Sequence, residues 1–238
     1  ISDWSKKDLV QLLRAAAEQE WVEDEEMLAT LYPNPYLMVW IGKQKRKVPS
    51  LDFKTVKEKF VNDINDEGER SLKDMFSSDE IKLFIINLAC IAPFSMKDET
   101  LLGKLAERMD RKIEAVRNKI NALVQAGVLR TVGNSIRFNP DMKGDVYLAY
   151  ELEKMPHEEL NELSRDWLPL CPEKLFINLE GASRYGDVPG LETIFSEIVD
   201  GWTKEAAETS KFERDERLKL AQTIAGLAPK ACLNLMYA

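Results

Sequence analysis

The sequence predicts a mostly α-helical protein: a small helical lid bundle, a winged helix-turn-helix with a short β-hairpin, and then antiparallel helical hairpins. Apolar residues recur at intervals of three and four along most of the 238 residues, which is the period of amphipathic helices. Only residues 128–138 change to the pattern of two short strands around a turn. The composition, 45% hydrophobic and 31% charged, is typical of a chain that folds.

The N-terminal region, residues 1–48, is predicted to form the small lid-like domain. The segment from Ser5 to Asp8 has the spacing of a capping box and begins a helix that should reach about residue 20. A second helix covers the acidic stretch that follows. The sequence Pro33-Asn34-Pro35 ends it, and a short apolar helix over Tyr36–Ile41 is expected to stop at Gly42.

Residues 49–76 are predicted to be connecting helices. The basic run at 43–47 before them is interpreted as a solvated helix end, where cations complement the exposed carbonyls. The polar stretch 62–70 interrupts the apolar period and predicts a hinge or linker. One face of an amphipathic helix precedes this hinge, marked by Phe53, Val56, Phe60 and Ile64.

The winged helix and the helix after it are assigned to residues 77–155. Ser77 or Ser78 should cap the first helix, a second helix runs over about 97–109, and a third helix stops at Gly127. Two apolar runs flank the turn Gly133-Asn134-Ser135. The order of three helices followed by a hairpin predicts this fold.

The last region, residues 156–238, is predicted to be a helical arm. Pro156 and Pro172 suit the first turns of two helices, and residues 181–190 are expected to form a loop. Two further helical segments reach the end of the chain. Short breaks between helices of this length favour antiparallel hairpins, with repeat-like stacking as an extension of the same pattern.

No catalytic or metal site is predicted. His157 is the only histidine and is interpreted as a polar residue in the first turn of a surface helix. No Gly-rich segment has the spacing of a P-loop or a dinucleotide-binding turn. Cys90, Cys171 and Cys232 are too far apart for a zinc knuckle and favour a reducing cytoplasm. No apolar run approaches the roughly 20 residues of a membrane span, so no membrane partner is expected.

The strongest site candidate in the residues themselves is a polar surface on the winged helix. Residues 78–140 carry ten Lys/Arg and seven Asp/Glu, whereas the whole chain has a net charge of −8. A locally basic winged helix could bind DNA, and the alternative is an ordinary solvated surface on a packing module. The candidate nucleic-acid contacts are Arg111, Lys112, Arg117, Asn118, Asn121, Arg130, Asn134 and Arg137.

Two segments resemble parts of bacterial STAND-type signalling ATPases, the AAA+ related group that includes NB-ARC and NACHT proteins. The segment Leu31–Leu37 resembles the Gly-x-Pro motif that opens a short helix of their lid domain, with Pro33 in place of the glycine. The segment Ile136–Asp145 resembles the junction between the wing and the next helix. Some relatives have a phosphate-sensing histidine there, and this chain has Asn139.

The resemblance implies the C-terminal part of such an ATPase, without its P-loop core. In that case Pro35 would pack on adenine and Asn139 would face the phosphates of ATP or ADP bound to the chain's own upstream core. This fragment would hold no cofactor itself and would not be an enzyme. It would couple the nucleotide state to a protein partner bound by the helical arm. A winged-helix transcriptional regulator that binds DNA is the alternative function.

Overall fold

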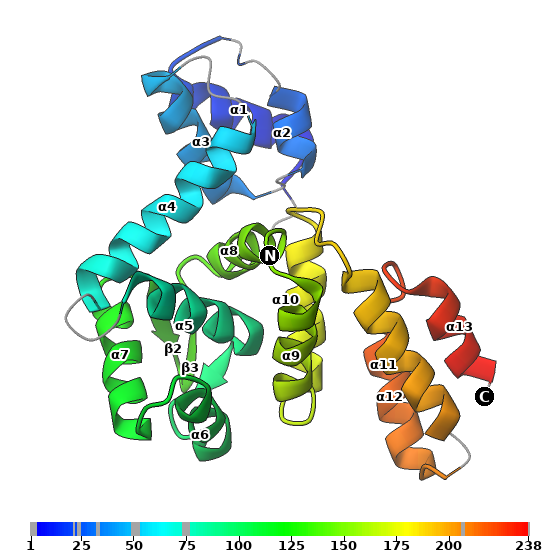
Figure 1. Cartoon of the computed structure of the whole chain (residues 1–238). Helices are drawn as coiled ribbons and strands as arrows, with labels where there is room; N and C mark the ends of the chain where they lie inside the picture. The colour runs from blue at the N-terminus through cyan, green and yellow to red at the C-terminus, as the bar shows by residue number, and fades with distance from the viewer. Residues whose placement is uncertain are drawn as a thin grey trace. The chain divides into compact units, whose positions relative to one another are not determined.

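The computed structural model of the protein describes residues 4–20, 22, 25–31, 34–48, 53–72, 77–205 and 208–237. Within these ranges it contains thirteen helices and one small three-stranded antiparallel sheet, which confirms the mostly helical prediction (Figure 1). The chain divides into two compact units, Ile1–Ile64 and Asn65–Ala238. The boundary falls inside a single helix, α4 (Phe53–Leu72).

The first unit begins with α1 (Lys6–Ala17), α2 (Glu25–Leu31) and α3 (Pro35–Lys47). The predicted capping box is confirmed, because the Ser5 side chain accepts a hydrogen bond from the backbone of Asp8 while the Asp8 carboxylate accepts from the backbone of Ser5. The hydrophobic faces of α1 and α3 pack against each other and form the core of this unit.

Helix α3 does not stop at Gly42, so that prediction was wrong. A Cβ atom at Gly42 would lie 2.6 Å from the Ala16 side chain and 2.6 Å from the Leu13 carbonyl oxygen. The glycine therefore permits close contact between α1 and α3 in the middle of the helix, and it is not a helix end. The basic run becomes the last turns of α3, where Lys45 is buried and Lys47 is exposed.

The hinge predicted over 62–70 is also absent, because α4 runs through it as one helix. Gly68 lies against Ile81 and Ile85, whose methyl carbons would be 3.2 and 3.1 Å from an added Cβ. The polar residues on the same helix also have partners: the Tyr147 hydroxyl donates a 2.7 Å hydrogen bond to Asn65. A polar surface was thus mistaken for a break in the helix.

The second unit continues from the end of α4 with three helices and three strands. Ser77 is the N-cap of the first of these helices and forms a capping box with Glu80. It is one of the two residues predicted to cap this helix. Gly127, with φ of 77°, follows the third helix near the predicted stop. The elements are α5 (Ser78–Ile91), β1 (Phe94–Ser95), α6 (Glu99–Arg108), α7 (Ile113–Gln125), β2 (Leu129–Val132) and β3 (Ser135–Phe138).

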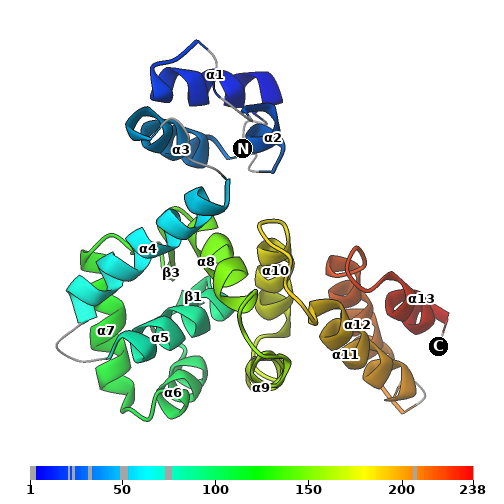
Figure 2. The same cartoon turned by 45° about the horizontal axis from the view of Figure 1, so that its top comes forward.

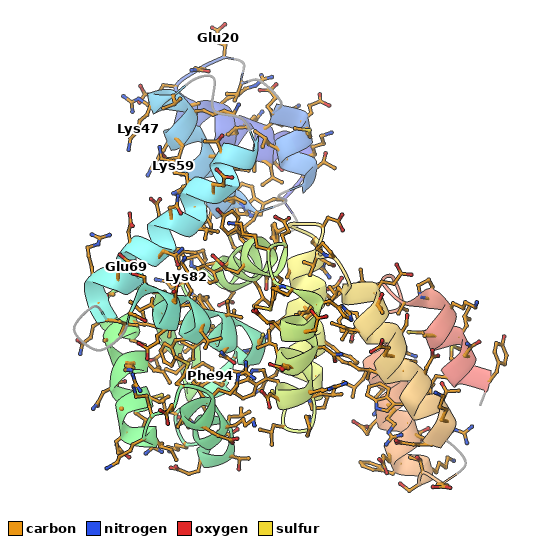
Figure 3. The ribbon with its side chains drawn as sticks, in the orientation of Figure 1. Glu20, Lys47, Lys59, Glu69, Lys82 and Phe94 are labelled. Atoms are coloured by element: carbon orange, nitrogen blue, oxygen red, sulfur yellow. The ribbon has the colours of Figure 1, made fainter. Side chains whose placement is uncertain are left out.

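The sheet has the order β1-β3-β2, with both pairs antiparallel. Phe94 is opposite Ile136, and Leu129 is opposite Phe138. Gly133 has φ of 60° in the two-residue loop between β2 and β3, as a type II′ turn requires at its first position. Strand β1 was not predicted, because a strand of two residues is too short to show an alternation of apolar and polar side chains. Its residue Phe94, labelled in Figure 3, is nevertheless almost fully buried.

Six further helices complete the second unit. Figures 1 and 2 show α8 and α10 side by side, and α8 also packs on α5. Helix α11 packs on α13, and the Phe176 and Phe195 rings meet edge to face between α10 and α11. The bounds are α8 (Met142–Leu152), α9 (His157–Trp167), α10 (Pro172–Ser183), α11 (Leu191–Glu205), α12 (Lys211–Thr223) and α13 (Pro229–Tyr237). Among the described helices none combines the length and apolarity that crossing a bilayer requires.

Two buried asparagines join α5 to the helices packed on it. The side chains of Asn87 and Trp167 are both fully buried, and the indole Nε1 of Trp167 donates a 2.9 Å hydrogen bond to the Asn87 Oδ1. Asn178 on α10 donates hydrogen bonds of 2.8 and 2.7 Å to the carbonyl oxygens of Cys90 and Ala92. Buried amides of this kind fix the relative positions of helices that apolar contacts alone would leave less defined.

Replacing Trp167 by Phe should destabilise the protein by about 1–3 kcal/mol beyond the loss of apolar area, because the Asn87 oxygen is left buried without a donor. Urea unfolding measures this. The double variant Asn87→Leu/Trp167→Phe should recover part of the loss, since both polar partners are then gone. Asn118→Leu on the exposed face of α7 is the matched control. Strictly additive losses in the double variant would contradict the pairing.

Candidate functional site

A cavity of about 240 Å³ lies where strand β3 leads into helix α8, and we name it the Asp145 cavity. Helix α10 forms its opposite wall, and the end of α5 with Pro93 closes one side. Its walls combine the apolar side chains of Phe138 and Ile177 and several small residues with five charged residues. The charged lining residues are Arg137, Asp141, Asp145, Glu180 and Arg184.

Most of these charges are already neutralised by a neighbour. Asp141 accepts from Arg130 at 3.2 Å and from Arg137 at 3.3 Å. The Arg184 guanidinium contacts the Glu180 carboxylate through three atom pairs of 2.7–3.0 Å, one helical turn apart on α10. The Nε of Arg137 is buried without an acceptor, so this guanidinium has only Asp141 as its ion-pair partner among the described residues.

Asp145 differs from the other two carboxylates. Among the described residues it forms neither a hydrogen bond nor an ion pair. Burial raises the pKa of Asp145 to about 7, and the nearby Arg184 opposes this shift only in part. The negative charges of Asp141 and Glu180 raise it further. Loss of hydration therefore outweighs the attraction of the Arg184 guanidinium.

Glycine at position 181 makes this placement of Asp145 feasible. A Cβ atom at Gly181 would lie 3.0 Å from Oδ1 of Asp145, closer than side chains normally approach. The sequence suggested a loop over 181–190, but Gly181 lies inside α10, which ends at Ser183. As at Gly42, the missing side chain lets two helices pack closely, here α8 and α10.

The two residues predicted to face a nucleotide are placed as follows. Pro35 is the first residue of α3, next to the N-cap Asn34, whose side chain accepts from the backbone of Tyr36 at 2.9 Å. Asn139 is exposed just before α8, and its amide donates a 3.3 Å hydrogen bond to the carbonyl oxygen of Gly127. The two residues belong to different compact units of the chain.

The arginines of the predicted DNA-binding surface all have carboxylate partners. Arg111 pairs with Glu80 at 2.7 Å, and Arg117 pairs with both Glu99 and Glu114. Arg130 and Arg137 pair with Asp141, as described above. Phosphate groups of a duplex would have to compete with these carboxylates. The remaining members of the predicted surface, Lys112, Asn118, Asn121 and Asn134, are exposed.

Sequence reasoning singled out only Arg137 among the charged residues of the Asp145 cavity. Two aspartates one helical turn apart, Asp141 and Asp145, and the spacing of Glu180 and Arg184 are ordinary features of solvated helices. Their proximity depends on the packing of α8 on α10, which no local pattern reveals. Within the described residues no three His, Cys, Asp or Glu side chains are grouped in a way that could hold a metal ion.

Comparisons with protein-family models, with curated proteins and with solved structures gave no match to this chain.

The stability of the protein should fall as pH rises from about 4 to about 7 because of Asp145. Its pKa is near 3.9 in an unfolded chain and about 7 in the fold, so the folded state binds the extra proton in this window. Above pH 7 this contribution is constant. Asp145→Asn, which cannot titrate, should gain roughly 2 kcal/mol or more relative to the parent between pH 4.5 and 8.

Urea midpoints at these two pH values measure the effect, and the exposed Asp187→Asn should keep the parent's pH dependence. Identical pH dependence of the parent and Asp145→Asn would show that the carboxylate titrates normally.

Duplex DNA should bind weakly, and the double variant Arg111→Ala/Arg117→Ala should change the affinity by less than about twofold at 0.15 M salt. The reason is that both guanidiniums are already paired with carboxylates. Fluorescence anisotropy with a labelled 20-base-pair duplex measures this. Tight, steeply salt-dependent binding that the double variant abolishes would instead support the DNA-binding alternative.

Proposed function

We propose that this chain is a non-catalytic regulatory and interaction region of a signal-transduction ATPase, which couples the nucleotide state of an upstream core to partner binding. The observation that carries the proposal is the order of elements. A helical bundle is followed by three helices and a hairpin, whose strand β3 also pairs with the short β1, and then by further helices. This is the order expected for a lid, a winged helix and a helical arm.

The junction between β3 and α8 is suited to transmit a change of nucleotide state. Asn139 lies on it, and an exposed side-chain amide can donate to a phosphate oxygen. Helix α8, which begins three residues later, packs on α5 and α10 and is buried along most of its length. A displacement of the junction would therefore move the helices behind it, as in rigid-body switching.

The helical arm offers a surface for a protein partner. Helix α13 exposes three large apolar side chains and α12 exposes one, and exposed apolar surface is typical of protein interfaces. On α13, Leu233, Met236 and Tyr237 are spaced three and four residues apart, which places them on one face. Phe212 on α12 is 77% exposed. In this proposal the partner binds the arm once the nucleotide-dependent contact is released.

The proposal requires a nucleotide-binding core on the same polypeptide, with Pro35 against the adenine and Asn139 at the phosphates. It also requires that the region itself does not turn over ATP. A P-loop and an acidic metal-binding strand encoded upstream of Ile1 would support it. ATP hydrolysis by the purified 238-residue chain, free of contaminating ATPase, would contradict it.

In the polypeptide that contains the core, Asn139→Ala should speed ADP release by about five- to tenfold, because one hydrogen bond to a charged phosphate is lost. Stopped-flow fluorescence of a labelled ADP measures the rate. Asn134→Ala, at the exposed tip of the hairpin, is the matched control and should release ADP at the parent's rate. Equal rates for all three proteins would contradict a role of Asn139 at the nucleotide.

A further inference from the structure

The Asp145 cavity combines an apolar pocket with one carboxylate that no neighbour neutralises. The apolar side chains of Phe138 and Ile177 line the pocket. The small residues Ala89, Gly144 and Gly181 also line it and leave the space open. A volume of about 240 Å³ is at the small end for ligand sites and suits a ligand of a few non-hydrogen atoms. The volume alone does not identify a ligand; the charges do.

The three carboxylates around the cavity are not equivalent. Asp141 has two arginine partners, Arg130 and Arg137, and Glu180 has Arg184 in a two-pronged contact. Each of these pairs lies within one element or between neighbouring ones and remains satisfied without a ligand. Asp145 alone among them lacks a hydrogen bond or ion pair within the described part of the chain. It therefore marks the place in the cavity where a positive charge is missing.

We propose that the Asp145 cavity binds a small organic cation, a guanidinium or primary ammonium group on a short apolar stem, with the cation on the Asp145 carboxylate. A charge-assisted hydrogen bond would compensate the hydration that the carboxylate loses. The stem would contact Phe138 and Ile177. An anion is disfavoured, because Asp141 and Glu180 already neutralise Arg137 and Arg184, and the donor left without an acceptor, the Arg137 Nε, is itself buried.

Proton linkage gives this site a specific signature. The groups that face Asp145 are Glu180 from α10, Arg184 and Tyr185 just after that helix, Asp141 just before α8, and Arg137 from β3. Burial keeps Asp145 protonated below about pH 7, so the cation must displace a proton there. Affinity should rise about tenfold per pH unit from pH 5 to near 7 and then level off.

The probe is ethylguanidinium chloride, titrated at up to 20 mM into the uniformly ¹⁵N-labelled chain. A ligand of this size should bind with a dissociation constant of roughly 1–10 mM at pH 8. Backbone amide signals of Gly144, Asp145 and Gly181 should shift. N-ethylurea has nearly the same shape without the charge and should cause no saturable shift of these signals.

Two variants separate the site from nonspecific attraction. Asp145→Asn should abolish binding, whereas the exposed Asp187→Asn should bind as the parent does. Glu180→Gln frees Arg184 to approach Asp145 and should weaken ethylguanidinium binding about tenfold or more. Folding of each variant is checked from the same spectra. Equal binding by the parent and Asp145→Asn, or binding that does not depend on pH, would overturn the proposal.

The same chemistry occurs in a free small amine and in an arginine side chain of a protein. A blocked Gly-Arg-Gly tripeptide distinguishes the two sources. Binding at least as tight as that of ethylguanidinium would assign the cavity to an arginine of a partner chain, and loss of binding would assign it to a free ligand. This inference stands on the cavity alone and does not depend on the proposed nucleotide coupling.

Discussion

The C-terminal half of helix α5 is fully buried, and the hydrogen bond between Asn87 and Trp167 is what allows a polar residue there. Residues 84–91 of this helix are all buried, so the helix needs neighbours on every side. Helices α8, α9 and α10 supply part of that cover. The second buried amide, Asn178, joins α10 to the last turn of α5. An apolar helix with two polar contacts thus fixes the positions of the elements around it.

The charged residues of the second unit depend on this arrangement. Because α10 is held against α5 and α8, Gly181 meets Asp145, and the carboxylate loses much of its hydration without gaining a partner. The Asp166 carboxylate of α9 accepts from both Lys104 and Arg108 of α6. The proposed winged helix and the start of the proposed arm are therefore joined by apolar, polar and ionic contacts. Nucleotide coupling through the β3–α8 junction would act on this joined body.

Local patterns predicted the elements far better than their contacts. Helices α1, α5, α6 and α7 and the hairpin follow from capping residues, apolar period and a Gly-Asn turn, all of which act within a few residues. Gly42 and Gly181 were misread as helix ends, because only the packing of a second helix shows why a side chain is excluded there. The hinge or linker predicted over 62–70 failed for a different reason: polar residues of α4 interrupt the apolar period without interrupting the helix. The strand β1 and the Asp145 cavity depend on residues that are far apart in the sequence, so no local signal identifies them.

Native-state hydrogen exchange measured as a function of urea tests whether α5 and its neighbours form one cooperative body. Amides in the middle of α5, α7, α8 and α10 should open with the same free energy and the same urea dependence, equal to those of global unfolding. Exchange in which α5, α6, α7 and the hairpin open together while α8, α9 and α10 stay protected would contradict the account. In that case the buried asparagines Asn87 and Asn178 would not couple α5 and the elements that open with it to helices α8, α9 and α10.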